Sequence, residues 1–363
     1  MECKRSTLEE LVRMELKALD GAKVLITGHT GFKGFWLSRL LQKFGTEVHG
    51  ISLAPEIGSL FDRASCDDFA SSHFLDITQQ QDLLSLMKKI SPDAIIHMAA
   101  QPLVRRSYRE PILTFKTNVI GTANILESMR SLKSVLGAVI VTSDKVYKNL
   151  ESGQAYKEND ELGGRDPYSA SKAASEMAVS AWRNIMSLES EKILISARAG
   201  NIIGGGDHSE DRLIPDLIRS FKLGTPAAIR NPSAIRPWQH ALDPLMGYVL
   251  LLSRILKSEE ISDSYNFGPN DDLNLTVSEL AEFACQEWGD TQSWVYQKNH
   301  DIFAEAKLLS LDSSKAKREL GWTPKLNTRE AVSWTIRWEK ESLSSGALAA
   351  IDGQIMEYLR LAG

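Results

Sequence analysis

Two residues in the middle of the chain have the types and the spacing needed to activate a hydroxyl group. Tyr168 and Lys172 lie four residues apart in DPYSASK (166–172), so on a helix they share one face. Asp166 and Pro167 predict that this helix begins here, as its N-cap and first residue. An ammonium group nearby lowers the pKa of a phenol, and the phenolate then takes a hydroxyl proton while a hydride leaves the same carbon. By itself such a pair is commonly a purely structural feature.

A glycine-rich turn upstream provides a place for a dinucleotide. The segment GHTGFKG (28–34) follows the strand-like run KVLIT (23–27) directly and opens a helical pattern. Glycines let the backbone approach a pyrophosphate, whose charge the free N–H groups of a helix N-terminus bind. A tight turn without a ligand is the alternative interpretation, but the first strand–helix junction favours a nicotinamide dinucleotide, whose ribose Lys172 would hold. The predicted contacts of this turn are Gly28, Thr30, Gly31, Phe32, Lys33 and Gly34.

The sequence leaves the choice between NAD and NADP open. The second strand pattern (47–53) ends without the carboxylate that would bind an adenosine ribose diol. Lys33 would tolerate a 2′-phosphate. Asp76 and Ile77 follow the third strand pattern, where the carboxylate is predicted to meet the adenine amino group. An acid at the start of a helix is an equally good interpretation of Asp76.

A parallel sheet is needed to bring these residues to one edge. Apolar runs alternate with helical patterns between residues 22 and 200, which predicts an α/β fold with a doubly wound parallel sheet of the Rossmann type. Strands are expected at 23–27, 47–53, 73–75, 94–98, 138–142 and 193–199, and helices at 35–44, 79–90 and 112–130. Asp144 and Lys145 follow the fifth strand, at its carboxyl end, where such sheets bind ligands.

After residue 200 the pattern changes to loops and helices. Helical patterns recur at 211–223, 244–257, 277–288 and 331–340. Trp334 and Trp338 lie one helical turn apart, which indicates core residues. We predict a helical extension over 1–21, followed by a cofactor-binding domain that consists of 22–200 together with 240–270. The remaining segments, 201–239 and 271–363, are predicted to form a smaller α/β lobe. A cleft between the two would bind the substrate.

The composition argues against several other classes of protein. The 363 residues include 42 Lys and Arg against 47 Asp and Glu, a net charge of −5, which does not favour nucleic-acid binding. No apolar run approaches the roughly 18 to 20 residues of a membrane span. Cys3, Cys66 and Cys285 are widely spaced without a histidine cluster, so neither a disulfide framework nor a metal site is expected. The first twenty residues are charged throughout, unlike a signal peptide, so we expect a cytoplasmic enzyme.

Taken in order, the motifs resemble the extended short-chain dehydrogenase/reductase family. The glycine turn is followed by Ala99-Ala100, Asn118, Ser143 and the tyrosine–lysine pair. Longer segments are similar to the nucleotide-sugar 4,6-dehydratases of that family: HMAAQPLVRRSY (97–108), TSDK (142–145), RAGN (198–201), GGGD (204–207), IRPWQH (235–240) and NFGPN (266–270). The resemblance covers nearly all of the chain from Lys23 onward. It implies a Rossmann domain with a smaller lobe, tightly bound NAD regenerated in each turnover, CDP-glucose as substrate, and a homodimer or homotetramer.

The resemblance also implies a reaction and its catalytic residues. Such a dehydratase oxidises the sugar at C4, eliminates water across C5 and C6, and returns the hydride to C6. Asp144 would protonate the departing C6 hydroxyl, Lys145 would take part in removing the C5 proton, and Ser143 would hydrogen-bond the C4 oxygen beside Tyr168. Related dTDP-glucose dehydratases carry Glu at the position of Lys145, and a lysine must be neutral when it acts as a base.

Further ligand contacts follow from the same resemblance. Ala99, Ala100 and Asn118 join the cofactor contacts. The substrate contacts are Gln101, Arg105, Ser143, Asn201, Arg236 and His240. Arg236 lies in a loop, and a guanidinium suits the oxygens of a diphosphate. No metal ligand is expected.

Three alternative functions are compatible with these patterns. An NAD(P)-dependent sugar epimerase or ketoreductase of the same fold would not need an acid and a base for elimination, so Asp144 and Lys145 favour a dehydratase. A 4,6-dehydratase could act on a different nucleotide sugar. A nucleotide-binding regulatory protein without turnover would not need Tyr168 and Lys172.

Overall fold

The computed structural model describes residues 16–64, 68–151, 153–270, 275–289, 292–297 and 309–362. Most of the predicted N-terminal helix lies outside these residues, as do Cys3 and Cys66. Of residues 1–21, the described part contains the short 3₁₀ turn η1 (Lys17–Leu19), with Leu16 and Leu19 buried in the main core.

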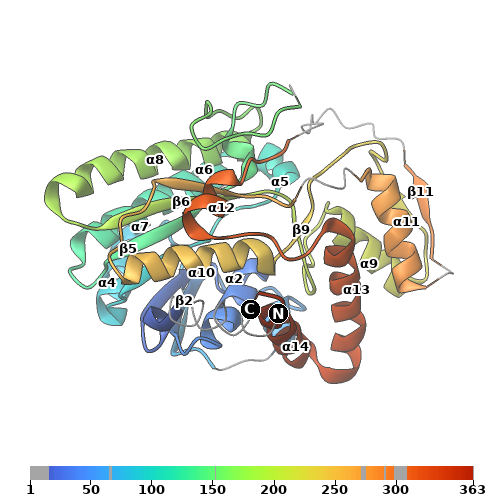
Figure 1. Cartoon of the computed structure of the whole chain (residues 1–363), viewed down its shortest axis with the longest axis horizontal. Helices are drawn as coiled ribbons and strands as arrows, with labels where there is room; N and C mark the ends of the chain where they lie inside the picture. Colours follow the sequence, from blue (N-terminus) through green and yellow to red (C-terminus); the bar gives the residue numbers. More distant parts are fainter. Residues whose placement is uncertain are drawn as a thin grey trace.

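Seven parallel strands form the central sheet (Figure 1). They are β1 (Lys23–Thr27), β2 (Glu47–Ser52), β3 (Ser71–Phe74), β4 (Ala94–His97), β5 (Gly137–Val141), β6 (Ile193–Ala199) and β10 (Ser264–Phe267). Their order across the sheet is β10-β6-β5-β4-β1-β2-β3, and every neighbouring pair is parallel. The predicted α/β doubly wound sheet is therefore confirmed.

Helices cover both faces of the sheet. α2 (Phe32–Gln42) and α10 (Leu242–Leu256) pack on one face, in a core that includes Val24 and Ile26 of β1. α4 (Gln80–Ile90), α7 (Gly121–Ser131) and α8 (Pro167–Glu189) pack on the other face, in a core that includes Leu25. Alternate residues of one strand thus supply both cores, as expected for a strand buried on both sides.

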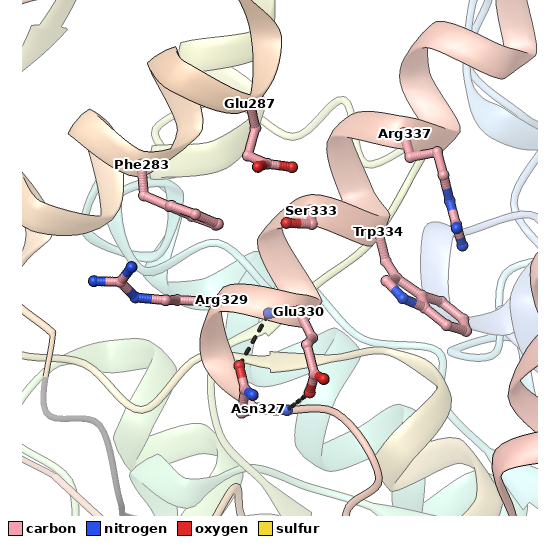
Figure 2. Close-up of a pocket in the computed structure, with 8 residues that line it drawn as sticks. All are labelled: Phe283, Glu287, Asn327, Arg329, Glu330, Ser333, Trp334 and Arg337. Atoms are coloured by element: carbon pink, nitrogen blue, oxygen red, sulfur yellow. Dashed lines mark hydrogen bonds between the residues drawn. The ribbon is translucent and has the colours of Figure 1, made fainter.

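Elements from the second half of the chain surround a third core. They are α9 (Leu213–Leu223), β8 (Ala227–Ile229), α11 (Val277–Trp288), β11 (Trp294–Tyr296) and α13 (Thr328–Ser345). α13 begins with a capping box, in which the Asn327 side chain accepts from the Glu330 N–H and the Glu330 carboxylate accepts from the Asn327 N–H (Figure 2). Trp334 and Trp338 are buried, as predicted. The pocket in Figure 2, between α11 and α13, contains none of the predicted site residues.

Shorter elements and a last long helix complete the chain. They are α3 (Leu60–Ala64), α5 (Val104–Arg109), η3 (Asp144–Val146), β7 (Ile202–Ile203), β9 (Gln239–His240), α12 (Ser314–Leu320) and α14 (Ala347–Ala362). α14 returns to the main core. Its Asp352 accepts from Arg39 of α2 and from Lys43, the C-cap of that helix, both at 2.8 Å. Its Tyr358 donates to Asp243 of α10, also at 2.8 Å.

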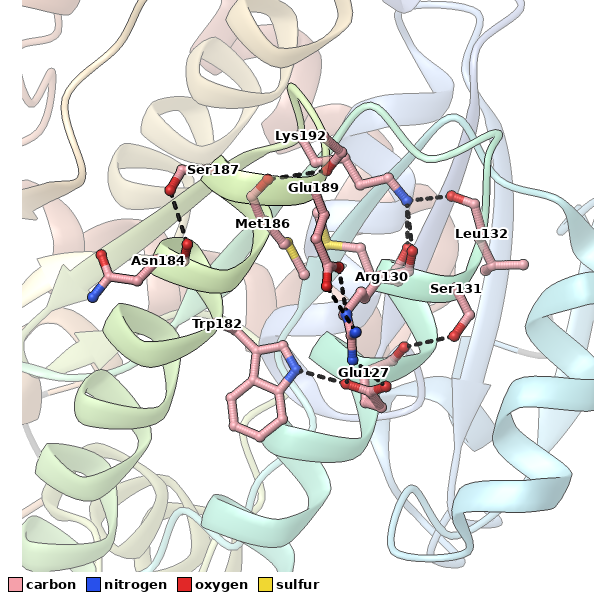
Figure 3. Close-up of polar contacts among 12 residues, drawn as sticks. Glu127, Arg130, Ser131, Leu132, Trp182, Asn184, Met186, Ser187, Glu189 and Lys192 are labelled. Carbon is pink, nitrogen blue, oxygen red and sulfur yellow. Dashed lines mark hydrogen bonds and ion pairs between the residues drawn. The ribbon is translucent and has the colours of Figure 1, made fainter.

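Charged side chains tie the C-terminal ends of α7 and α8 together (Figure 3). Arg130 of α7 donates to both carboxylate oxygens of Glu189, at 2.6 and 2.9 Å. Trp182 of α8 donates its indole N–H to Glu127 of α7 at 3.1 Å. Lys192 donates to the backbone carbonyl oxygens of Met129 and Arg130 at the end of α7, where the last turn of a helix leaves carbonyl groups open to further bonds. The helix that carries the tyrosine–lysine pair is thereby fixed against its neighbour.

The segment 112–130, predicted as one helix, is divided in the structure. It contains α6 (Pro111–Phe115), a π-helical turn η2 (Lys116–Ile120) and then α7. Asn118 lies in the π turn, and its amide donates to Gln101 O at 3.1 Å and to Ser171 Oγ at 2.9 Å. Asparagine is a poor helix former, and these buried bonds accompany the locally widened helix.

Candidate active site

The glycine turn between β1 and α2 has room only for glycine at its two ends. Gly28 has a φ of +82°, and a Cβ there would lie 2.9 Å from Ala99 N. A Cβ on Gly34 would lie 2.0 Å from Gly28 O. The residues of the turn line a large cleft, so the N-terminus of α2 is accessible to a ligand. This arrangement fits the pyrophosphate of a dinucleotide.

A hydroxyl group lies at the end of β2. Ser52 Oγ is hydrogen-bonded to the ring of His29 at 3.0 Å, and the other ring nitrogen of His29 is bonded to Ser72 of β3 at 2.7 Å. His29 is fully buried, and burial lowers its pKa to about 4. Glu56 follows on the same wall of the cleft, 3.2 Å from His208. Residues 52–56 therefore offer the cleft one hydroxyl group and one carboxylate, and no cationic side chain.

Lys33 is directed to the catalytic centre. Its Nζ donates to the hydroxyl of Tyr248 of α10 at 3.2 Å and lies 5.1 Å from the centroid of that ring. Burial, followed by the positive charges of Lys172 and Arg212, lowers the pKa of Lys33 to about 7, and the Asp144 carboxylate opposes this shift. The idea that Lys33 holds a 2′-phosphate has no support in this geometry.

Tyr168 and Lys172 occupy the first turns of α8, as predicted. Asp166 caps the helix by accepting from the Ser169 N–H at 2.9 Å. Tyr168 is 8% exposed and Lys172 is 7% exposed. The Lys172 ammonium donates to the backbone oxygen of Val141 at the end of β5, at 3.2 Å. Burial lowers the pKa of Lys172 to about 8.

The sequence predicts a lowered pKa for Tyr168, whereas the pKa is raised in this structure. Burial raises the pKa of Tyr168. The groups that act against burial are the Lys145 ammonium, a hydrogen bond with Ser143 and the Arg212 guanidinium. Lys145 is thus the ammonium that favours the phenolate.

Ser143, Asp144 and Lys145 follow β5 in the turn η3. Ser143 Oγ donates to Asp144 Oδ1 at 2.8 Å and accepts from the Lys145 N–H at 3.2 Å. Lys145 Nζ lies 3.2 Å from the same carboxylate oxygen. Asp144 is 1% exposed, whereas the Lys145 side chain is 28% exposed. The two charged groups form a close ion pair in the wall of the cleft, beside Tyr168.

A buried ion pair stabilises the carboxyl edge of the sheet next to the cleft. Arg198 of β6 donates to both carboxylate oxygens of Glu176 of α8, at 3.0 and 2.8 Å. Thr142 donates to Glu176 at 2.5 Å. Both charged side chains are almost fully buried, and their two parallel bonds fix the geometry. Because Glu176 lies one helical turn after Lys172, this network holds the catalytic part of α8 against the end of β5.

One cleft brings most of the predicted residues together. Its lining includes the cofactor contacts Gly28, Thr30, Gly31, Phe32, Lys33, Gly34, Asp76, Ile77, Ala99 and Ala100, the residues Ser143, Asp144, Lys145, Tyr168 and Lys172, and the substrate contacts Gln101, Arg105, Asn201 and Arg236. Asp76 also accepts from the Thr78 N–H at 2.8 Å, but α4 begins only at Gln80 with Gln79 as its N-cap, so Asp76 does not cap this helix. The cleft volume of about 1260 Å³ exceeds the roughly 300 to 1,000 Å³ typical of one small ligand, so a cofactor and a substrate fit together.

Two predicted contacts lie outside this lining. Asn118 is 1% exposed, and its side chain is bonded to the backbone of Gln101, so it positions a lining residue. His240 is fully buried between Trp36 and Trp334, with ring centroids 5.7 Å away in both cases. Burial lowers the pKa of His240 to about 3. Its prediction as a substrate contact is wrong, because its side chain faces the core.

Several lining residues were not singled out by the sequence. Asp211, Arg212 and Arg230 line the cleft. Arg212 acts electrostatically on Lys33 and on Tyr168. The only available signal was a set of charged residues in loop-rich segments, which equally describes solvated loops.

The described ranges hold no metal-binding cluster and no membrane-spanning helix. No three His, Cys, Asp or Glu side chains there could together hold a metal ion. No helix there is both long enough and apolar enough to cross a membrane.

A tyrosine–lysine pair beside a glycine turn, at the edge of a doubly wound sheet, defines the short-chain dehydrogenase/reductase class, and this chain has both. The family model described as GDP-mannose 4,6 dehydratase matches residues 25–335, and the chain belongs to this family. It is 43% identical over 329 residues to CDP-glucose 4,6-dehydratase from Salmonella typhimurium, covering 88% of this chain and 91% of that protein. It is 28% identical to dTDP-glucose 4,6-dehydratase from Haemophilus influenzae, covering 87% and 97%.

A solved structure shows the same architecture. DesIV, a dTDP-glucose 4,6-dehydratase from Streptomyces venezuelae with NAD and TYD bound, matches with a TM-score of 0.75 and 26% sequence identity. The match covers 88% of this chain and 97% of DesIV.

Proposed function

We propose that this protein is a hydro-lyase that converts CDP-glucose to CDP-4-dehydro-6-deoxyglucose, with NAD as a tightly bound cofactor that is regenerated in each turnover. The observation that carries the proposal is that two sets of groups meet in one cleft: Tyr168 with Lys172, and Asp144 with Lys145. An enzyme that only moves a hydride needs the first set, whereas elimination of water also needs an acid and a base. The 43% identity to the Salmonella typhimurium enzyme supports CDP-glucose, against 28% for the dTDP-glucose relative.

The residues of the cleft account for how the cofactor would be held. The N–H groups of the glycine turn would bind its pyrophosphate, Lys172 its nicotinamide ribose, and Asp76 with Ile77 its adenine. When bound, NAD supplies a reversible acceptor for the hydride of C4. The end of β2 supports NAD over NADP, because a 2′-phosphate would meet Glu56 and no cation among residues 52–56.

The first chemical task of the chain is to remove the C4 hydroxyl proton. Tyr168 accepts this proton while Ser143 hydrogen-bonds the same oxygen. Because burial favours the neutral phenol, the phenolate depends on the ammonium of Lys145 and on Ser143 for its stabilisation. The C4 ketone that results makes the neighbouring C5–H acidic enough to be removed.

The Asp144–Lys145 ion pair accounts for the elimination. Transfer of one proton from Lys145 to Asp144, across the 3.2 Å contact, gives a neutral amine and a carboxylic acid at once. The amine takes the C5 proton, and the acid protonates the departing C6 hydroxyl to form water. Both groups then carry their original charges. Return of the hydride to C6 needs one proton at C5, and loss of the C4 hydroxyl proton from Tyr168 to solvent balances it, so all three groups regain their starting protonation states.

The two parts of the chain would divide the binding of the ligands. We propose that residues 22–200 with 240–270 hold NAD, and that 201–239 with 271–363 hold the nucleotide sugar. Arg236 and Asn201 would bind the diphosphate, and both line the cleft.

We also propose a homodimer or homotetramer located in the cytoplasm. Exposed apolar side chains gather on α6, η2 and α8, which are adjacent in the structure: Ile112, Leu113, Phe115, Ile120 and Met177. Pairing this surface with a second copy would remove it from water. Light scattering of Ile112→Asp should show a smaller assembly than the unaltered protein.

Incubation with CDP-glucose tests the reaction. The expected product has lost one water and develops the alkali-induced absorbance of a 4-keto-6-deoxy sugar, without net formation of NADH. A product of unchanged mass would favour an epimerase instead. Stoichiometric NADH would indicate an ordinary dehydrogenase, and conversion of dTDP-glucose in place of CDP-glucose would overturn the substrate.

A further inference from the structure

On one wall of the cleft, a single carboxylate lies between two arginines from different elements. Asp211 Oδ1, just before α9, accepts from Arg105 of α5 at 3.3 Å and from Arg230, which follows β8, at 2.6 Å. All three residues line the cleft. Burial alone would raise the pKa of Asp211, but the hydrogen bond from Arg230 and the charges of Arg105, Arg230 and Arg109 outweigh it and lower the pKa. The cluster therefore presents an ionised carboxylate and guanidinium groups side by side.

Asp211 and its neighbour Arg212 act on different parts of the cleft. Arg212 influences Lys33 and Tyr168, so it reaches toward the catalytic centre. The charges with the largest influence on Asp211 are those of Arg105, Arg230 and Arg109. A nucleotide sugar with its sugar at Tyr168 and its diphosphate at the cations nearby would extend its nucleoside end toward Asp211.

Apolar side chains next to this cluster could accommodate a ring. Ala227 and Ile229 of β8, beside Arg230, line the cleft together with Trp238 and Val277. Apolar walls with a few polar groups are typical of sites that bind an organic ring in a defined orientation.

The chemistry of the cluster distinguishes between possible ligand groups. A carboxylate between the arginines repels a diphosphate, so the cluster is poorly suited to phosphate alone. It suits a group that offers an N–H donor beside acceptors. Cytosine has an exocyclic amine next to a ring nitrogen and a carbonyl oxygen, and carboxylates accept from that amine. Uracil and thymine have a carbonyl oxygen where cytosine has the amine, and this oxygen would face the carboxylate.

We propose that Asp211 and Arg230 read the base of the substrate as cytosine. Asp211 accepts from the exocyclic amine, Arg230 donates to the ring acceptors, and Arg105 fixes the carboxylate. An ionised carboxylate has about four acceptor positions, so the two bonds from the arginines leave room for the amine. This assignment rests on the proposed function, since it concerns the base of the same substrate.

The backbone at Asp211 determines which substitutions are informative. Its φ of +60° lies in the left-handed region, which Asp and Asn tolerate better than most other residues. Asp211→Asn therefore keeps the backbone and the side-chain shape, but replaces an acceptor by an amide that can also donate. Asp211→Gly keeps the backbone conformation and removes the side chain.

Calorimetric titration of the full chain with NAD and either CDP or UDP tests the proposal. The unaltered protein should bind CDP roughly 10- to 100-fold more tightly than UDP. In Asp211→Asn and in Asp211→Gly this ratio should fall to about one to three. Arg230→Met should weaken CDP binding roughly tenfold.

Asp216→Asn is the matched control. It removes the same charge from a carboxylate that pairs with Arg219 and lies 4.0 Å from Arg230. CDP and UDP carry the same charge, so a general electrostatic effect changes both affinities equally. The CDP-to-UDP ratio of this variant should match that of the unaltered protein.

An unchanged ratio in folded Asp211→Asn and Asp211→Gly would overturn the assignment. Tighter binding of GDP than of CDP would also overturn it, because the donors of guanine match a carboxylate too. The binding of CDP and UDP can be measured whether or not the protein catalyses a reaction. Failure to convert CDP-glucose would therefore count against the proposed function alone, and the CDP-to-UDP affinity ratio could still be measured. Conversion of CDP-glucose with an unchanged ratio would remove only the base assignment.

Discussion

Two walls of the cleft differ in how burial and neighbouring charges act on their ionisable side chains. The catalytic wall consists of Ser143, Asp144, Tyr168 and Lys172. The recognition wall consists of Arg105, Asp211 and Arg230. Exposures on the first run from 1% to 8%, whereas the side chains of the second are 18% to 31% exposed. Burial raises the pKa of Tyr168 and lowers that of Lys172, while the arginines lower the pKa of Asp211. Burial makes the charged forms costly, which allows protons to move, whereas paired charges stay ionised and can recognise a ligand.

The largest expected effect tests the catalytic wall. Tyr168→Phe removes the group that accepts the C4 hydroxyl proton, so turnover of CDP-glucose should fall roughly 10²- to 10⁴-fold. The recognition wall is untouched, so the affinity for CDP should stay within about twofold, as calorimetry would show. A parallel loss of CDP binding would mean that the two walls are not separate.

The next effect concerns Lys145, which pairs with Asp144 of the catalytic wall but is 28% exposed, and it separates two steps of the reaction. Lys145→Ala should allow oxidation at C4 to proceed, at a reduced rate because the phenolate loses a stabilising charge. Elimination should then stall, with roughly 10²- to 10³-fold slower product formation. Stopped-flow absorbance should show the reduced nicotinamide building up in a single turnover.

Exchange at C5 provides the control for Lys145. Solvent deuterium should enter C5 at a much reduced rate in Lys145→Ala. Lys145→Glu restores the residue type of related dTDP-glucose dehydratases and should recover part of the exchange. Normal exchange in Lys145→Ala would assign the base to another group.

A smaller effect is expected from the substrate-binding side of the cleft. Arg236→Ala should raise KM for CDP-glucose roughly 10- to 100-fold and change kcat by less than about threefold. This is because a contact with the diphosphate stabilises the bound substrate and the transition state equally. Steady-state kinetics check this. Arg219→Ala, whose partner is Asp216 outside the catalytic groups, should leave both parameters nearly unchanged. A fall in kcat for Arg236→Ala would place Arg236 with the catalytic residues.

The smallest effect concerns a buried carboxyl that belongs to neither wall. Burial raises the pKa of Asp243 from 3.8 to about 6. The folded state therefore holds this proton more tightly than the unfolded state. The stabilisation is fully present below pH 4 and is lost as pH rises through 6. Asp243→Asn should remove on the order of 3 kcal/mol of this pH dependence from the free energy of unfolding, measured by urea denaturation at several pH values.

Asp243 also tests whether a shifted pKa is by itself a sign of function. Asp243 does not line the cleft, so turnover of Asp243→Asn at pH 7 should equal that of the unaltered protein. If the free energies of unfolding of the two proteins changed with pH in the same way, the pKa of Asp243 would not be shifted in the folded protein.

The sheet could be predicted because its signals are local. Alternation of apolar runs with helical patterns located six of the seven strands, and the cap at Asp166 marked the start of α8. The glycine turn and the tyrosine–lysine pair were found for the same reason, since each is a short contiguous pattern. The π turn at Asn118 lacks such a pattern, because it depends on bonds to Gln101 and Ser171 elsewhere in the chain.

Contacts between distant residues could not be predicted from one sequence. Lys33 meets Tyr248 across 215 positions, and Arg105 meets Asp211 across 106. The i, i+4 spacing put Lys172 on the same face as Tyr168, but it could not show that the ammonium reaches Val141 O. His240 was misassigned for a related reason, because the side to which a residue of a two-residue strand faces depends on what packs against it.

The return of α14 to α2 has a consequence for how the protein is made. Arg39, one turn beyond the glycine turn, pairs with Asp352, which lies 313 positions later. At roughly 5 to 20 residues per second, a ribosome needs roughly 15 to 60 s to reach that partner. Until then, the surface of α2 that α14 covers is open to water and to other nascent chains. The helix that follows the glycine turn is therefore translated early, but its contacts with α14 form only after Asp352 has been translated.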